Sequence, residues 1–111
     1  MGKATAPNLL QGTLDLLILH ALRRGSAHGY AVAQTIHLLS EEVLKVEEGS
    51  LYPALHRLEE SSWIKAKWVT TENKRRARVY EITTKGREFL EAEEERWMTV
   101  NAALVRVLKH A

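Results

Sequence analysis

The sequence contains no cysteine, and only two prolines and six glycines among 111 residues. Without cysteine the chain has no disulfide framework, no cysteine-ligated zinc site and no thiol redox switch. Aromatic residues are also scarce, at 6%, so we expect the core to consist mainly of leucine, isoleucine, valine and alanine. No repeat or flexible linker divides the chain, and its length suffices for one core only.

Long apolar runs are missing as well. The longest lies around Leu14 to Leu22, where Asp15 and His20 interrupt it, and it is too short to cross a bilayer. Residues 1–8 hold one lysine and no apolar stretch, which argues against a signal peptide and predicts a flexible N-terminus. We therefore expect a cytoplasmic protein with no membrane partner.

Motifs that carry enzyme chemistry are absent too. The five histidines show no metal-ligand spacing, and there is no glycine-rich phosphate loop and no nucleophile elbow. The sequence therefore predicts a protein that is not an enzyme and that holds neither a cofactor nor a metal ion.

Apolar residues at helical spacing predict three helices in the first half of the chain. The first begins between Asn8 and Gly12 and ends at Gly25. The second runs from His28 to Leu39, with Ser26 as a candidate cap. Their buried faces are expected to be formed by Leu14, Leu17, Ile18, Ala21 and Leu22 in the first helix and by Val32, Ile36 and Leu39 in the second.

The third helix follows Gly49, with Ser50 as its N-cap and Pro53 in its first turn, where a missing N–H costs nothing. Its buried stripe consists of Leu51, Leu55 and Leu58. At about 100° per residue, the opposite face carries Tyr52, Pro53, His56 and Arg57.

A period of two then replaces the helical period. Apolar and basic residues alternate from Ile64 to Trp68, as in a half-buried strand, and a second strand is predicted from Arg76 to Thr83. The polar stretch from Thr70 to Arg75 joins them as the tip of an antiparallel hairpin.

Thr83 or Thr84 is expected to cap a last helix that runs to about Lys109, a length of about 39 Å. Its apolar residues repeat at spacings typical of a coiled-coil seam, which needs a partner surface, and a second copy of the chain supplies one. The seam consists of Leu90, Trp97, Val100, Leu104 and Val107. Trp97 has two possible roles, as an aromatic residue of the dimer core and as a flat apolar wall for a small effector at the interface. The two roles are compatible.

Positive charge is concentrated in one segment. Residues 61–87 hold eight basic residues against two acidic ones, whereas residues 88–111 hold five glutamates against three basic residues. A local cationic patch favours a polyanion, chiefly nucleic acid or an anionic membrane surface.

Three helices, a basic hairpin and a long helix, in this order, predict a mainly α (α+β) fold: a winged helix-turn-helix with a long C-terminal dimerisation helix. The DNA-binding domain would span residues 9–83 and the dimerisation helix residues 84–111. The third helix would enter the major groove of double-stranded DNA, and the hairpin would lie along the phosphates. The candidate DNA-binding residues are Ser50, Tyr52, Pro53, His56, Arg57, Lys74, Arg75, Arg76 and Arg78.

Several of these motifs resemble those of PadR-type transcriptional regulators, over about residues 9–110. The resemblance is carried by Gly49 to Glu59 (GSLYPALHRLE), Leu10 to Leu19 (LQGTLDLLIL), His28-Gly29-Tyr30, Glu72-Asn73 with Arg75-Arg76-Ala77, and Tyr80 with Ile82-Thr83 and Gly86. A departure is Ser62, which stands where a glycine usually precedes Trp63.

The resemblance implies a homodimeric regulator, most often a repressor, of the smaller subfamily with one C-terminal helix. It also implies release from DNA by a small aromatic or cationic effector, and Trp97 is placed like a tryptophan that lines a drug-binding pore in some members. From these features we predict binding to a pseudo-palindromic operator. Two alternatives are a winged-helix protein-interaction module without DNA binding, and a ligand-binding dimer acting as an enzyme or carrier.

Overall fold

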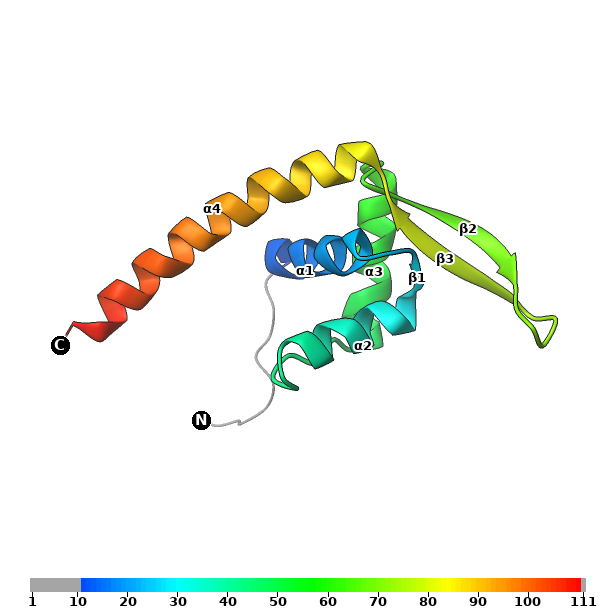
Figure 1. The fold of residues 1–111 in the computed structure, drawn as a ribbon, viewed down its shortest axis with the longest axis horizontal. Coiled ribbons are helices and arrows are strands. Elements are labelled where there is room, and N and C mark those ends of the chain that lie inside the picture. The colour runs from blue at the N-terminus through cyan, green and yellow to red at the C-terminus, as the bar shows by residue number, and fades with distance from the viewer. Residues whose placement is uncertain (1–10, 111) are drawn as a thin grey trace.

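The computed structural model describes residues 11–110, so the predicted flexible segment over residues 1–8 lies outside the described residues. The elements in chain order are α1 (Gln11–Arg23), β1 (Ala27–His28), α2 (Gly29–Leu39), α3 (Glu48–Glu60), β2 (Ile64–Thr70), β3 (Arg76–Ile82) and α4 (Thr84–Lys109). The β2–β3 hairpin and α4 extend in opposite directions from the three shorter helices (Figure 1). The predicted winged helix-turn-helix with a small antiparallel sheet and a long C-terminal helix is confirmed.

The core lies where α1, α2, α3, the inner end of the sheet and the first part of α4 meet. Most of the predicted apolar faces are buried there, including Ile18 and Leu22 of α1 and the leucine stripe of α3. Two residues differ from the prediction. Leu17 is only partly buried, and Leu39, at the end of α2, is 52% exposed.

The start of α2 differs from the prediction because a strand precedes it. Ala27 and His28 form β1, which pairs antiparallel with β3 opposite Tyr80 and Val79. His28 therefore occupies the N-cap position without a side-chain cap, and Ser26 does not cap the helix. Two residues are too few to show the alternating pattern of a strand, so the sequence did not predict β1. Its backbone hydrogen-bond partners lie along the edge of β3.

The start of α3 also differs from the prediction. The N-cap is Glu47, so Gly49 and Ser50 lie inside the first turn and Ser50 is not the cap. The N–H of Leu51 donates to the carbonyl of Glu47 at 2.9 Å, which already closes one helical turn before Pro53. The negative charge of Glu48 in that first turn is favourable beside the positive end of the helix dipole.

The end of α3 is closed by a Schellman motif. The N–H of Ser62 donates to the carbonyl of Glu59 at 2.9 Å, and the N–H of Trp63 donates to that of Leu58 at 3.0 Å. Ser62 adopts a φ of 63°, in the left-handed region that favours glycine. Ser62 therefore adopts a backbone conformation that glycine usually occupies at the end of a helix.

The hairpin and the last helix agree with the prediction in type and nearly in bounds. β2 and β3 pair antiparallel from Ile64 opposite Ile82 to Thr70 opposite Arg76, and the strand order is β1-β3-β2. α4 has 26 residues, and the hydroxyl oxygen of Thr83 caps it by accepting the N–H of Gly86 at 3.0 Å. Among the described helices, none combines the length and the apolar character that crossing a membrane requires.

Candidate nucleic-acid interface

The outer face of α3 presents four of the predicted DNA-binding residues to solvent. Ser50, Tyr52, Pro53 and His56 are exposed, whereas Leu51, Ala54, Leu55 and Leu58 on the inner face are buried. The 3.6-residue period separates the two faces in the way that the leucine spacing predicted. This leaves a polar and aromatic helix face of the size that a DNA major groove admits.

The ring of Tyr52 lies close to the start of α2. A Cβ atom at Gly29 would lie 3.0 Å from Cε1 of Tyr52 and 3.2 Å from its hydroxyl oxygen. The glycine at the start of α2 therefore gives the ring room to lie against the helix, while the side chain stays 45% exposed. The start of α2 and the first part of α3 are therefore closely packed at Tyr52.

Arg57, predicted to face DNA, is engaged by the protein itself. Its Nη2 donates to Oδ1 of Asp15 on α1 at 2.9 Å, and the arginine side chain is 35% exposed. Burial raises the pKa of Asp15 above its ordinary 3.8, although the charge and the hydrogen bond of Arg57 act in the opposite direction. This ion pair fixes α3 on α1.

The wing, which we define as β2, β3 and the loop 71–75 between them, carries the other predicted cations. Lys74 and Arg75 are exposed in the loop, and Lys74 has a φ of 60° in its tight turn. The N–H of Arg75 donates to the side-chain oxygen of Thr71 at 3.2 Å. The tip therefore presents two neighbouring cations from a hydrogen-bonded loop.

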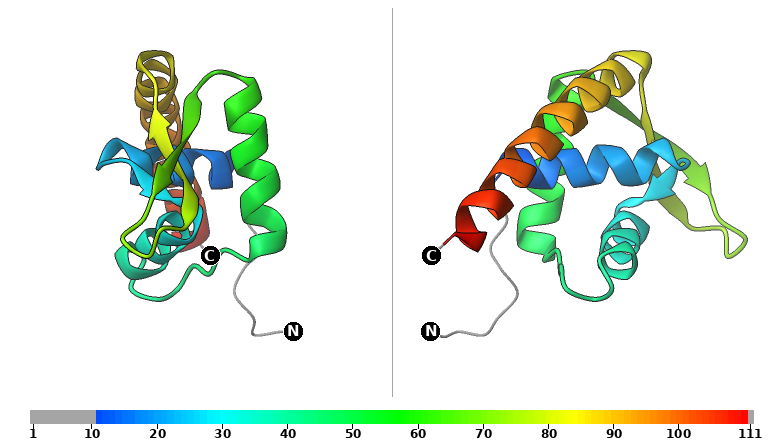
Figure 2. Two further views of the ribbon diagram at one scale, coloured as in Figure 1. Left: turned by 90° about the vertical axis from the view of Figure 1, so that its right-hand side faces the viewer. Right: turned by 60° about the vertical axis from the view of Figure 1, so that its left-hand side comes forward.

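Arg76 and Arg78 lie further along β3 and make specific contacts. The guanidinium of Arg76 lies 4.7 Å from the ring centre of Trp68, and Nη2 of Arg78 donates to Oε2 of Glu59 at 2.9 Å. Since Glu59 belongs to α3, the Arg78–Glu59 pair ties the wing to the third helix. The left panel of Figure 2 shows α3 standing beside this hairpin.

The predicted seam of α4 divides into a buried and an exposed part. Leu90 is fully buried against the body, whereas Trp97, Val100, Leu104 and Val107 are between 41% and 68% exposed. Three exposed residues outside the predicted seam, Met98, Val105 and Leu108, widen this apolar surface. They fall outside a strict heptad pattern but follow the broader apolar face of an ordinary helix.

An apolar groove of about 650 Å³ lies between α1 and α4. Trp97, the predicted effector residue, is part of its lining, together with Thr13, Leu16, Leu17, His20, Arg23, Leu44, Glu94 and Met98. Of the predicted seam, only Trp97 reaches this groove, and the other four residues lie elsewhere on α4.

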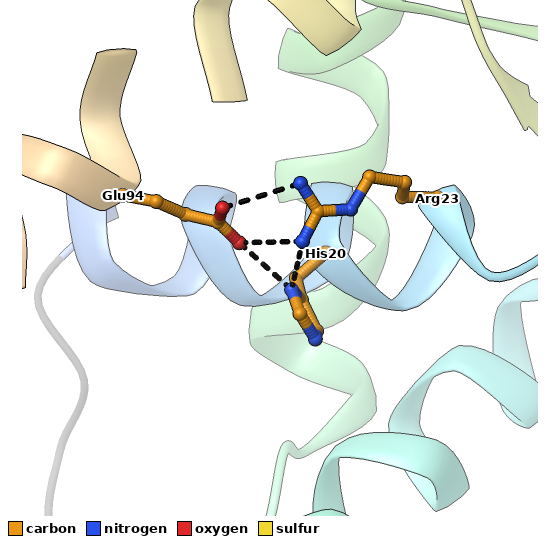
Figure 3. Close-up of polar contacts among 3 residues, drawn as sticks. All are labelled: His20, Arg23 and Glu94. Atoms are coloured by element: carbon orange, nitrogen blue, oxygen red, sulfur yellow. Dashed lines mark hydrogen bonds and ion pairs between the residues drawn. The ribbon is translucent and has the colours of Figure 1, made fainter. Parts of the chain in front are cut away.

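Three polar side chains of this groove, His20, Arg23 and Glu94, form a cluster that sequence patterns do not reveal (Figure 3). Arg23 donates two hydrogen bonds to the carboxylate of Glu94, at 3.0 and 3.2 Å, and Nδ1 of His20 lies 2.8 Å from the same carboxylate. Burial acts to raise the pKa of Glu94, but the hydrogen bonds and charges of its two partners outweigh it and hold the pKa below its ordinary 4.5. Arg23 and Glu94 are 71 residues apart, so no local spacing could reveal the pair.

Comparisons with known proteins agree with this fold. A model of the Transcriptional regulator PadR-like family matches residues 18–92. A solved transcriptional regulator from Clostridium thermocellum is 29% identical, with a TM-score of 0.80, over 89% of this chain and 96% of that one. A PadR-like transcriptional regulator from Bacillus cereus is 26% identical, with a TM-score of 0.77, over 92% and 97% of the two chains.

A third similar structure is Bacillus subtilis PadR in complex with operator DNA. It is 23% identical to this chain, with a TM-score of 0.64, and the match covers 71% of this chain and 45% of that one. At this level of identity the likeness shows a shared fold.

Proposed function

The chain belongs to the PadR-like family of transcriptional regulators, and from this premise we propose that it binds double-stranded DNA as a homodimer and represses transcription. Membership of a family of transcriptional regulators agrees with the prediction that the protein is not an enzyme. One observation carries the proposal: the exposed outer face of α3 lies beside a cationic wing that is tied to the same helix by the Arg78–Glu59 pair. The B. subtilis protein of the same fold, in its complex with operator DNA, supports this use of the fold.

The wing and α3 make different contacts with DNA. Lys74, Arg75 and Arg76 of the wing contact phosphates, which supplies most of the affinity and makes it strongly dependent on salt. Tyr52 and His56, with Ser50 and Pro53 beside them, face the base edges from α3. Arg57 and Arg78 belong to the interface as residues that hold α3 and the wing in position, since each is already paired with a carboxylate.

The homodimer forms through α4. Its apolar surface, from Trp97 to Leu108, is large, and its exposure to water is unfavourable in free energy. A second copy of the same helix covers this surface. A twofold dimer places two α3 helices about 34 Å apart, one turn of DNA, and so reads a pseudo-palindromic operator. A location in the cytoplasm, with the DNA, follows from this function.

A small aromatic or cationic effector binds where Trp97 lines the groove between α1 and α4. The groove is mostly apolar, as ligand sites usually are, and it touches both the DNA-binding part and the dimerisation helix. An effector that prefers one angle between these two parts shifts the dimer away from the form that fits DNA.

Footprinting on the DNA that flanks the protein's own gene tests the main proposal. The expected result is protection of two half-sites with centres one helical turn apart, together with binding to a random duplex at low salt. If the purified protein binds neither duplex at low salt, the protein-interaction module becomes the better interpretation. The effector proposal is tested separately, by titrating planar aromatic cations into the complex and following release of the operator.

A further inference from the structure

Four side chains of the wing lie on the face that points toward α3. In the β2–β3 register, Trp68 is opposite Arg78, with Tyr80 opposite Ala66 on one side and Arg76 opposite Thr70 on the other. Side chains two residues apart share one face of a strand. Because Arg78 reaches Glu59, the face shared by Trp68, Arg76, Arg78 and Tyr80 is the one turned toward the third helix.

Cation–π contacts join these four side chains into one row, which we call the stack. The guanidinium of Arg76 lies 4.7 Å from the ring centre of Trp68, and that of Arg78 lies 5.7 Å from the same centre and 5.7 Å from the ring of Tyr80. Tyr80 is buried in the core, whereas Trp68 is 55% exposed. The stack therefore extends from the core outward along the wing, and Trp68 is a large aromatic that neither the core nor the α4 surface explains.

Stacking constrains an arginine without using up its hydrogen-bond donors. The cation–π interaction engages the flat face of the guanidinium, and the five N–H groups at its edge remain available to an anion. A free arginine side chain loses considerable rotamer freedom when it binds a phosphate. An arginine already held against an indole has lost part of that freedom in advance.

We propose that Trp68 is a positioning residue of the DNA interface, which holds Arg76 so that its guanidinium edge meets a phosphate of the DNA backbone beside α3. Arg78 fixes the stack relative to α3 through Glu59, and Trp68 carries that position outward to Arg76. The ligand of this arrangement is the phosphodiester backbone, so the contribution is independent of base sequence. The inference rests on the proposed DNA-binding function and adds a residue that charge alone does not identify.

A double-mutant cycle tests the proposal. The dissociation constant for a random-sequence duplex is measured for the wild-type protein, Trp68→Ala, Arg76→Ala and the double variant. We expect Trp68→Ala to weaken binding about three- to fivefold. The double variant should bind no more weakly than Arg76→Ala alone, because Trp68 acts through Arg76. Additive effects, or no effect of Trp68→Ala, would overturn the proposal.

Two further comparisons guard against a merely structural effect. Trp68→Phe keeps an aromatic face and should bind nearly as the wild type does, whereas Trp68→Leu keeps the apolar bulk without that face and should bind as weakly as Trp68→Ala. Arg75 lies outside the stack, so the effects of Trp68→Ala and Arg75→Ala should add. Equal binding by the phenylalanine and leucine variants contradicts the proposal, even if Trp68→Ala does not fold.

The outcome for the wild-type protein separates the two proposals. If it binds the duplex and the cycle shows no coupling between Trp68 and Arg76, only the inference about Trp68 fails. If it binds no duplex at low salt, both the inference and the proposed function fail.

Discussion

The indole of Trp63 stacks on the ring of Phe89, with the ring centres 3.7 Å apart and the planes 15° from parallel. Trp63 follows the end of α3 by three residues, and Phe89 lies near the start of α4. The carbonyl oxygen of Trp63 also accepts the N–H of Thr83 at 3.0 Å. The helix that would read DNA and the helix that would join two subunits are thus connected at one joint.

Replacing Gly86 by alanine tests the closeness of this joint. A Cβ atom at Gly86 would overlap the carbonyl oxygen of Trp63, which is backbone and cannot turn aside. Although alanine favours helices, we expect Gly86→Ala to lower the free energy of unfolding by about 1–3 kcal/mol, as measured in urea. Gly12→Ala is the matched control, because a Cβ there meets nothing within 4 Å, and it should not destabilise the protein.

Replacing Ser62 by glycine should stabilise the protein. Ser62 has a φ of 63°, a conformation that costs a residue with a Cβ atom but not glycine. We expect Ser62→Gly to raise the free energy of unfolding by about 0.5–1 kcal/mol. The neighbouring Ser61 has a φ of −82°, so Ser61→Gly should have the opposite effect. A lower melting temperature for Ser62→Gly would contradict the argument.

The pairing of Glu94 with Arg23 and His20 predicts a pH dependence of stability. Because the folded-state pKa of Glu94 lies below its ordinary 4.5, the ionised carboxylate stabilises the folded protein above about that pH. That stabilisation is lost as the pH falls through the folded-state pKa. We therefore expect Glu94→Gln to be less stable than the wild type at pH 7, with a difference that shrinks toward pH 3 in urea titrations. Glu91→Gln, an exposed change on the same helix outside this cluster, is the matched control.

Removing the cations of the wing should weaken DNA binding without changing its sequence preference. Each lost phosphate contact lowers the dependence of binding on salt by about one unit of slope in a double-logarithmic plot. For the double variant Arg75→Ala with Arg76→Ala we expect a slope smaller by about two, and similar losses of affinity for operator and random duplex. A loss confined to the operator would show that these residues read bases.

A charge on the exposed surface of α4 should prevent the dimer from forming. Leu104 is 54% exposed in the isolated chain, and covering it by a second copy would remove that apolar area from water. We expect Leu104→Asp to sediment as a monomer and to lose most operator affinity, whereas Thr99→Asp, an exposed change on the side of the helix away from Leu104, should remain a dimer. A wild-type protein that is monomeric at micromolar concentration would contradict the dimer itself.

Hydrophobic period and residue order were sufficient to predict the three short helices, the hairpin and the long helix. Capping preferences were a weaker guide, because Ser26 and Ser50 are both good caps locally but neither performs that role. At the start of α2, pairing between β1 and β3 replaces a cap, and α3 simply begins earlier, at Glu48.

Contacts between residues distant in sequence could not be predicted from spacing. Arg57 was expected on the DNA-facing surface, and its partner Asp15 lies 42 residues away on a helix that the same reasoning treated only as a buried face. The alternating pattern of the strand identifies Trp68 only as one apolar position. Its contact with Arg76 depends on the hairpin register, which the loop length alone did not fix.

The unbroken length of α4 turns the joint at Gly86 and Trp63 into the pivot of a lever. The helix spans about 39 Å, so a swing of about 5° at the pivot moves its far end by roughly 3 Å. In a dimer whose subunits are joined at the C-terminal ends of α4, the same swing would instead move each winged helix-turn-helix part. A small change in the packing of Trp63 against Phe89 would therefore cause a larger change in the distance between the two α3 helices. That distance determines which operator spacing the dimer can bind.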